Sequence, residues 1–278
     1  EGAEALARAA WRLTRLDLGH NDIGAAGAAV LAASPVLRRV EVLGLAGNAL
    51  GSDGAGAVAM SREMAALSSL ELSGNAIGAS GNTTVDATWD TSQAGASLRI
   101  DTYFRVAYGT VLTLAPGTEV GFDPYGQFEV TGGLIAEGTP GQPITFTSAL
   151  SVPHAGDWQQ IYAWDIARLR LSHCLIAYAG VYNYAAVELR GNDAILRDCR
   201  IRDSKQTGLL INGALHPTVE GITITGSGGY AIWQSPDASV LYRRLALTDN
   251  AHNAIGTSGN TNADATWDLA LAGAPLEI

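Results

Sequence analysis

The chain has 278 residues, of which 47% are hydrophobic, only 16% are charged and 33 are glycine, and its formal net charge is −10. The acidic balance and the absence of a Lys/Arg run argue against nucleic acid or an anionic membrane surface as a partner, and no apolar run approaches the roughly 18 residues that a membrane-spanning helix needs. Low charge with abundant Gly and Ala is typical of stacked repeats, whose thin cores need small residues at close turns.

The first 81 residues repeat a leucine pattern with a constant step of 27 residues. Alternating leucines bury one face of a short strand, and the asparagine that follows can bond backbone groups where the chain leaves that strand. Ala-rich stretches at 24–34 and 51–66 are predicted to form helices behind the strands, and residues 2–10 a further helix. The copies are Leu13-x-x-Leu16-x-Leu18-x-x-Asn21, Val40-x-x-Leu43-x-Leu45-x-x-Asn48 and Leu67-x-x-Leu70-x-Leu72-x-x-Asn75. This pattern strongly resembles leucine-rich repeats of the longer, helix-containing type, so we expect such a segment over residues 1–81.

One stretch occurs twice, 178 residues apart and without a gap. It reads NAIGASGNTTVDATWDTSQAGASLRI at 75–100 and NAIGTSGNTNADATWDLALAGAPLEI at 253–278. We predict that it is an adaptor between solenoid segments, with Trp89 and Trp267 as matching buried residues. The sequence begins inside a repeat and ends in the second copy. We therefore expect either a longer parent chain or ends that neighbouring subunits cover.

The region 101–255 follows a second pattern, in which short apolar strands recur every 23 to 25 residues. The segments VLTLAPGTEVGF, GQFEVTGGLIAEGTPGQPITFTS and GDWQQIYA are similar to the opening of bacterial surface proteins that contain a right-handed parallel β-helix. This resemblance covers roughly residues 98–278. It implies a mainly β solenoid in which a short α/β leucine-rich segment (1–81) and a junction (82–100) precede a right-handed parallel β-helix (101–255). Residues 256–278 would then start a further module.

Equal positions of successive coils in such a β-helix would stack about 4.8 Å apart. The 23- to 25-residue steps therefore predict two core columns, Cys174–Cys199–Ile222–Leu245 and Ile176–Ile201–Ile224–Leu247. The two cysteines share their column with Ile and Leu, so we interpret them as small buried hydrophobic residues. Adjacent coils would also bring them near enough for a disulfide, although a straight stack seldom has suitable geometry, and a metal-binding or catalytic role is a third reading.

Parallel β-helices host polysaccharide lyases, hydrolases and epimerases, which need two or three carboxylates converging on a groove. The candidate acids are Asp198, Asp203 and Asp249, and the nearby candidates are His173, Arg170, Arg200 and Lys205. Asp203 and Asp249 follow core strands directly, where Asp usually serves the backbone of a turn. The five histidines form no metal-ligand spacing. We therefore predict no catalytic set, no metal site and no cofactor, and we keep a carbohydrate-active enzyme as the alternative.

Aromatic residues concentrate between positions 158 and 184. The candidate ligand-binding residues are Trp158, Tyr162, Trp164, Tyr178, Tyr182 and Tyr184. Such clusters stack on sugar rings or mark protein contacts, although Trp158 also matches the turn tryptophan of the β-helix resemblance and the tyrosines could simply cover an uneven stretch between coils.

These patterns predict a non-catalytic structural or adhesive rod that is secreted or held at a bacterial cell surface, with its signal outside this sequence. Its expected partners are further copies of itself end to end or further modules of the same chain, and possibly glycans or surface proteins. Neither nucleic acid binding nor membrane insertion is expected. A glycan- or protein-binding module that uses the aromatic residues of 158–184 is a further alternative.

Overall fold

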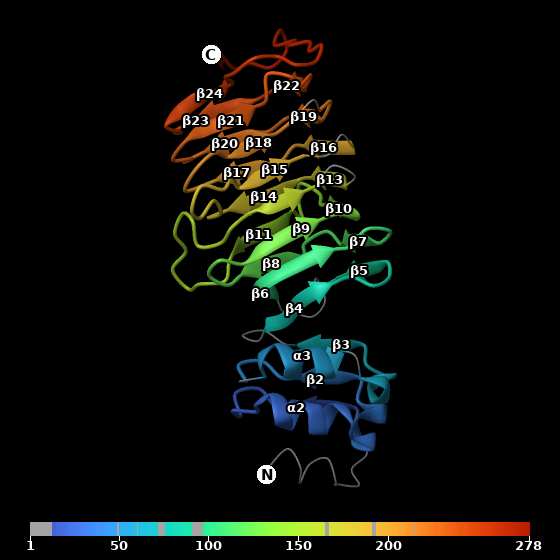
Figure 1. Ribbon diagram of the computed structural model, residues 1–278. Helices are drawn as coiled ribbons and strands as arrows, with labels where there is room; N and C mark the ends of the chain where they lie inside the picture. The colour runs from blue at the N-terminus through green and yellow to red at the C-terminus, as the bar shows by residue number, and fades with distance from the viewer. Residues whose placement is uncertain are drawn as a thin grey trace. The chain divides into compact units, whose positions relative to one another are not determined.

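The computed structural model describes residues 13–48, 50–59, 61–71, 76–90, 97–164, 167–190, 193–213 and 215–278 (Figure 1). They form two compact units, one within 1–79 and 91–99 and the other within 80–90 and 100–278. The predicted helix at 2–10 and Asn75 lie outside the described residues. No described helix is long and apolar enough to cross a bilayer.

The first unit is built from leucine-rich repeats, in which short helices connect the strands of a parallel three-stranded sheet. Its elements are β1 (Arg15–Asp17), α2 (Ala25–Ala32), η1 (Pro35–Arg39), β2 (Val42–Gly44), α3 (Gly51–Ala59), η2 (Arg62–Met64) and β3 (Ser69–Glu71). The register Leu16–Leu43–Leu70 reproduces the 27-residue period. Both predicted helices are present, but each ends early and a short 3-10 turn follows it. Ser34 and Ser61 cap these turns by accepting bonds from Val36 N and Glu63 N.

Asn48 is the buried asparagine of the repeat, and its side chain joins two coils. Its Oδ1 accepts hydrogen bonds from the backbone N–H groups of Asn21 and Ile23, both at 3.0 Å. Its Nδ2 donates to the carbonyl oxygens of Leu18 and Leu45, at 2.8 and 2.9 Å. The predicted backbone role of the repeat asparagine is therefore confirmed at this position.

The second unit is a parallel β-helix whose coils contribute strands to three faces (Figure 1). Face 1 contains β5 (Ala87–Trp89), β7 (Val111–Leu114), β10 (Gly133–Glu137), β13 (Arg168–Ser172), β16 (Asp193–Arg197), β19 (Thr218–Glu220) and β22 (Leu241–Arg243). Face 2 contains β8 (Glu119–Phe122), β11 (Ile144–Ser148), β14 (Cys174–Ala177), β17 (Arg200–Arg202), β20 (Thr223–Thr225) and β23 (Ala246–Thr248). Face 3 contains β9 (Gln127–Val130), β12 (Ile161–Ala163), β15 (Val187–Leu189), β18 (Leu209–Ile211), β21 (Tyr230–Gln234), β24 (His252–Gly256) and β25 (Leu276–Glu277).

The strand register confirms the predicted core column that begins at Ile176. Ile176, Ile201, Ile224 and Leu247 pair in succession on face 2, and the column continues downward through Phe146 and Val120. Cys174 and Cys199 are buried, unbonded thiols in adjacent coils, and the Cys174 backbone N–H donates to Cys199 Sγ at 3.4 Å. Hydrogen bonding to Cys199 and burial both raise the pKa of the Cys174 thiol. The cysteines therefore act as small core residues.

Each regular coil turns its corners on single residues with a left-handed backbone. The corner between faces 1 and 2 is His173, Asp198, Gly221 or Arg244 in successive coils, and the corner that ends face 2 is Tyr178, Asp203, Gly226 or Asp249. Their φ angles lie between 48° and 70°, a region that Gly, Asn, Asp and His tolerate better than other residues. The left-handed backbone of the corners therefore explains why aspartate occupies several of them.

Each copy of the repeated stretch contributes two strands that pair with each other. In the first copy β4 (Ala76–Asn82) pairs with β6 (Ser97–Val106), and in the second β24 pairs with β25. Trp89 lies 4.7 Å from the Phe104 ring, measured between centroids, and Trp267 Nε1 donates to Ala238 O at 3.1 Å. Both tryptophans are half-buried, so they match each other but are less enclosed than buried core residues.

Candidate functional site

The predicted aromatic set does not form one surface. Trp158 is completely buried, its ring stacks on Phe122 at 4.0 Å with an interplanar angle of 5°, and its Nε1 donates to Ala177 O at 2.8 Å. Its ring is therefore not accessible to a ligand. Assigning Trp158 to a binding site is therefore corrected, because the inserted loop before β12 folds this side chain into the β-helix.

Tyr162 and Trp164 belong to a polar cluster on the outside of face 3. Their rings meet edge to face at 5.0 Å, and Trp164 Nε1 donates to Glu129. Glu129 also accepts from the Tyr103 hydroxyl and from Arg105 Nη2, the latter at 3.1 Å. Burial, followed by the bond to Glu129, raises the pKa of Tyr103 to about 12. The strand register places Glu129 and Glu188 on either side of Tyr162, so two acids and an aromatic ring share one outward column.

Tyr182 is the most exposed member of the predicted set, and it stacks on a residue outside that set. Its ring lies 5.7 Å from the Tyr125 ring at an interplanar angle of 16°, and the two side chains are 61% and 55% exposed. Both residues have left-handed φ angles, 59° and 70°. We call these residues the tyrosine pair. Tyr184 is also exposed, whereas Tyr178 is half-buried and its hydroxyl accepts from Arg202.

Tyr125 was missed because it precedes the aromatic-rich stretch by 33 positions and belongs to an earlier coil. Its sequence signal is weak: a tyrosine between two core strands in D-P-Y-G, a typical turn. The coils of the two tyrosines are not adjacent. They meet where two long connections lie in the coils concerned, 149–160 between β11 and β12 and 178–186 between β14 and β15.

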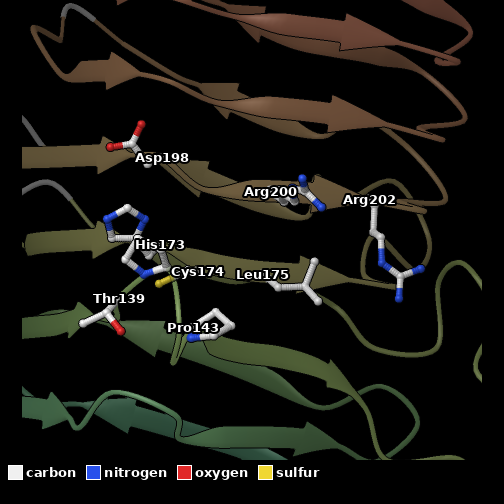
Figure 2. Close-up of a pocket in the computed structure, with 9 residues that line it drawn as sticks. Thr139, Pro143, His173, Cys174, Leu175, Asp198, Arg200 and Arg202 are labelled. Carbon is white, nitrogen blue, oxygen red and sulfur yellow. The ribbon is translucent and has the colours of Figure 1, made fainter.

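A groove of about 510 Å³ lies at the junction of faces 1 and 2. We call it the basic groove, and its lining residues come from three successive coils: Thr139, Pro140, Pro143, His173, Cys174, Leu175, Asp198, Arg200 and Arg202. Figure 2 shows Arg200 and Arg202 on one strand, with His173 and Asp198 at the corner toward the other end of the groove. The groove brings together three of the residues that were considered for catalysis, namely His173, Asp198 and Arg200.

The remaining catalytic candidates lie elsewhere. Asp203 and Asp249 occupy the corner that ends face 2, separated by the coil of Gly226. Arg170 lies on face 1, where its Nη1 donates to Leu169 O. The Lys205 stem packs beside Gly156. Asp203 forms an ion pair with Arg202, and Asp198 forms one with Arg244 at 3.4 Å. The predicted acids are therefore distributed along two edges, and they do not converge.

Comparison with known families agrees with this architecture. No curated protein and no solved structure is significantly similar to the chain. A family model described as a right-handed beta helix region matches residues 159–266, and a model described as a leucine-rich repeat matches residues 13–32. The chain therefore contains a leucine-rich repeat segment and a right-handed β-helix region, as both sequence patterns predicted.

Proposed function

We propose that this chain is a non-catalytic structural or adhesive repeat protein, exported by a bacterium to its cell surface or to an extracellular assembly. Its partners would be further copies of itself, further modules of the same chain, or surface glycans and proteins. The observation that carries the proposal is the regularity of the coils. The three candidate acids, Asp198, Asp203 and Asp249, occupy single-residue corners, and two of them, Asp198 and Asp203, already pair with arginines. Asp203 and Asp249 lie two coils apart, which is about 9.6 Å along the stack.

The exposed aromatic rings that support an adhesive role are those of the tyrosine pair and of Tyr184. Exposed aromatic rings bind sugar rings or protein side chains with little loss of side-chain entropy. Left-handed backbone at a bulky residue is unfavourable by about 1 kcal/mol or more. Tyr125 and Tyr182 keep this strained conformation while their rings stay exposed, which favours a role in binding over a role in packing.

The test is a glycan array, together with an array of extracellular proteins, probed with the Tyr125→Ala/Tyr182→Ala double variant. We expect binding to fall at least about tenfold, because each stacked aromatic ring contributes about 1 kcal/mol. Tyr108→Ala is the matched control, since Tyr108 is 77% exposed and lies in a turn between β6 and β7. Melting temperatures should stay equal. Unchanged binding by the double variant would remove the tyrosine pair from the proposal.

The alternative function, a carbohydrate-active enzyme, has one observation in its favour: the basic groove places Asp198, His173 and Arg200 together. It is tested by assaying a panel of neutral and acidic polysaccharides for new reducing ends. We expect no cleavage. The control variant is Asp198→Asn, which keeps the size of the side chain but removes its charge. If the native chain cleaved a polysaccharide and this variant did not, the chain would be an enzyme and the proposed structural role would be wrong.

A further inference from the structure

The basic groove has a structural cause. In the coil that contributes β10 and β11, the corner is a loop through residues 138–143 instead of a single residue, and a bridge between Thr139 and Gln142 closes this loop. The next two coils turn on His173 and Asp198 alone. The loop contributes Thr139, Pro140 and Pro143 to the lining of the groove, and Leu175 of the next coil adds a further apolar side chain.

Two arginines of β17 form the other end of the groove. Arg200 and Arg202 alternate with the buried Ile201, so both point outward, about 6.6 Å apart along the strand. Their neighbours in the ladder are uncharged: Leu175 and Ala177 on one side and Thr223 and Thr225 on the other. The strand residues beside Arg200 and Arg202 therefore carry no charge that could pair with either guanidinium.

Among the described residues, Arg202 has an acidic partner within ion-pair distance and Arg200 does not. Arg202 is held by Asp203 and by the Tyr178 hydroxyl, and its guanidinium carbon lies 4.6 Å from the Tyr178 ring centre. Asp198, the acid of the groove, is already paired with Arg244. The Arg200 side chain forms no ion pair or hydrogen bond within the described part of the chain. The groove thus presents one unpaired cation beside a second cation that is fixed in position.

We propose that the basic groove binds a sugar ring that bears a single oxyanion group. Arg200 and Arg202 would hold the oxyanion, which charge-assisted bonds to guanidinium groups favour. Thr139, His173 and Asp198 offer donors and acceptors for hydroxyl groups, and Pro143 and Leu175 contact the body of the ring. The volume of about 510 Å³ admits more than a bare ion. The net charge of −10 disfavours a long polyanion, so one anionic group fits better than many.

The inference is tested by isothermal titration calorimetry of the full chain at low ionic strength. The probes are glucuronic acid and glucose 6-phosphate, which carry the oxyanion as a carboxylate or a phosphate, and glucose and inorganic phosphate, which represent the two halves. We expect both acidic sugars to bind at least about tenfold more tightly than glucose, since a hydrogen bond to a charged group contributes about 1.5–3 kcal/mol. Inorganic phosphate should be weaker than glucose 6-phosphate. The tighter of the two acidic sugars identifies the oxyanion.

The matched variants are Arg200→Gln and Arg243→Gln. Arg243 is an exposed arginine on face 1, outside the groove. Arg200→Gln should weaken acidic-sugar binding at least about tenfold, whereas Arg243→Gln should leave it within about twofold. Equal affinity for glucose and glucuronic acid, or an unchanged affinity in Arg200→Gln with an unchanged melting temperature, overturns the proposal. The proposal is also overturned if inorganic phosphate binds as tightly as glucose 6-phosphate. The result does not depend on the adhesive role, because the tyrosine pair is left intact.

Discussion

Asparagine joins neighbouring coils in both solenoids. Asn48 does so in the leucine-rich unit, and Asn250 repeats the arrangement in the β-helix. The Asn250 Oδ1 accepts from Ser227 N at 2.9 Å, and its Nδ2 donates to the carbonyl oxygens of Ile224 and Thr248. Both asparagines follow a core leucine by three positions, Leu45 and Leu247. The repeat motif predicted the role of Asn48, whereas a single Asn in the β-helix carries no periodic signal.

Tyrosine ionisation gives a test at the same scale. Burial raises the pKa of Tyr242 well above its usual range, and its hydroxyl donates to Gln234 Oε1 at 2.8 Å. The pKa of Tyr103 is raised to about 12. The folded chain therefore keeps protons that the unfolded chain loses near pH 10, so stability is fully present below pH 10 and falls as the pH rises above it.

Urea denaturation between pH 9 and pH 11.5 should show this loss, and absorbance at 295 nm should show that the two tyrosines ionise late. In Tyr242→Phe the free energy of unfolding should depend less steeply on pH. The variant also loses the hydrogen bond to Gln234, so its stability at pH 8 changes independently of this slope. A slope that is identical in the native chain and in Tyr242→Phe would contradict the assignment of the slope to this residue.

At the scale of the element, period and hydrophobic pattern predicted the strands and their register, because each coil buries the same side of each face. The corners were predicted less well. Aspartate at 203 and 249 indicated turns, but nothing local distinguishes Tyr178 or Arg244 from strand residues, since the neighbouring coils impose their left-handed backbone. The early ends of the helices α2 and α3 were not predicted either. Ser34 and Ser61 follow these helices, and each caps a new 3-10 turn.

Gly132, between β9 and β10, shows how tightly the coils approach. A Cβ atom at this position would lie 2.1 Å from Ala107 O and 2.4 Å from Thr110 O, and both atoms are backbone. Gly132→Ala must therefore push two coils apart, and we expect a loss of unfolding free energy on the order of 3 kcal/mol. Gly141→Ala is the control, because a Cβ there meets nothing within 4 Å.

Chemical denaturation of both glycine variants measures the difference directly. A Gly132→Ala protein as stable as Gly141→Ala would show that the coil spacing is not limited by this contact.

At the scale of the whole molecule, two repeat periods were enough to predict both solenoids. They were not enough to predict the site. The tyrosine pair and the basic groove arise where coils depart from the period: the pair at the long connections 149–160 and 178–186, and the groove at the loop 138–143. Which outward side chains such insertions bring together depends on three-dimensional packing. The stretch 158–184 contains the exposed Tyr182, but it also contains the core residue Trp158 and leaves out Tyr125.

The single-residue corners also determine where a protease can cut the β-helix. Backbone held on both sides by strand ladders does not enter a protease cleft, whereas exposed loop tips do. Limited subtilisin digestion should therefore cut first within 149–155 or 257–270, where most residues are exposed. Mass spectrometry would locate the cuts, and an early cut at the corner of Asp198 or Gly221 would contradict this.

A chain nicked at 149–155 should still elute as one particle, because β10–β13, β11–β14 and β9–β12 pair residues on opposite sides of the break. Loss of covalent continuity at that loop would thus leave the solenoid whole.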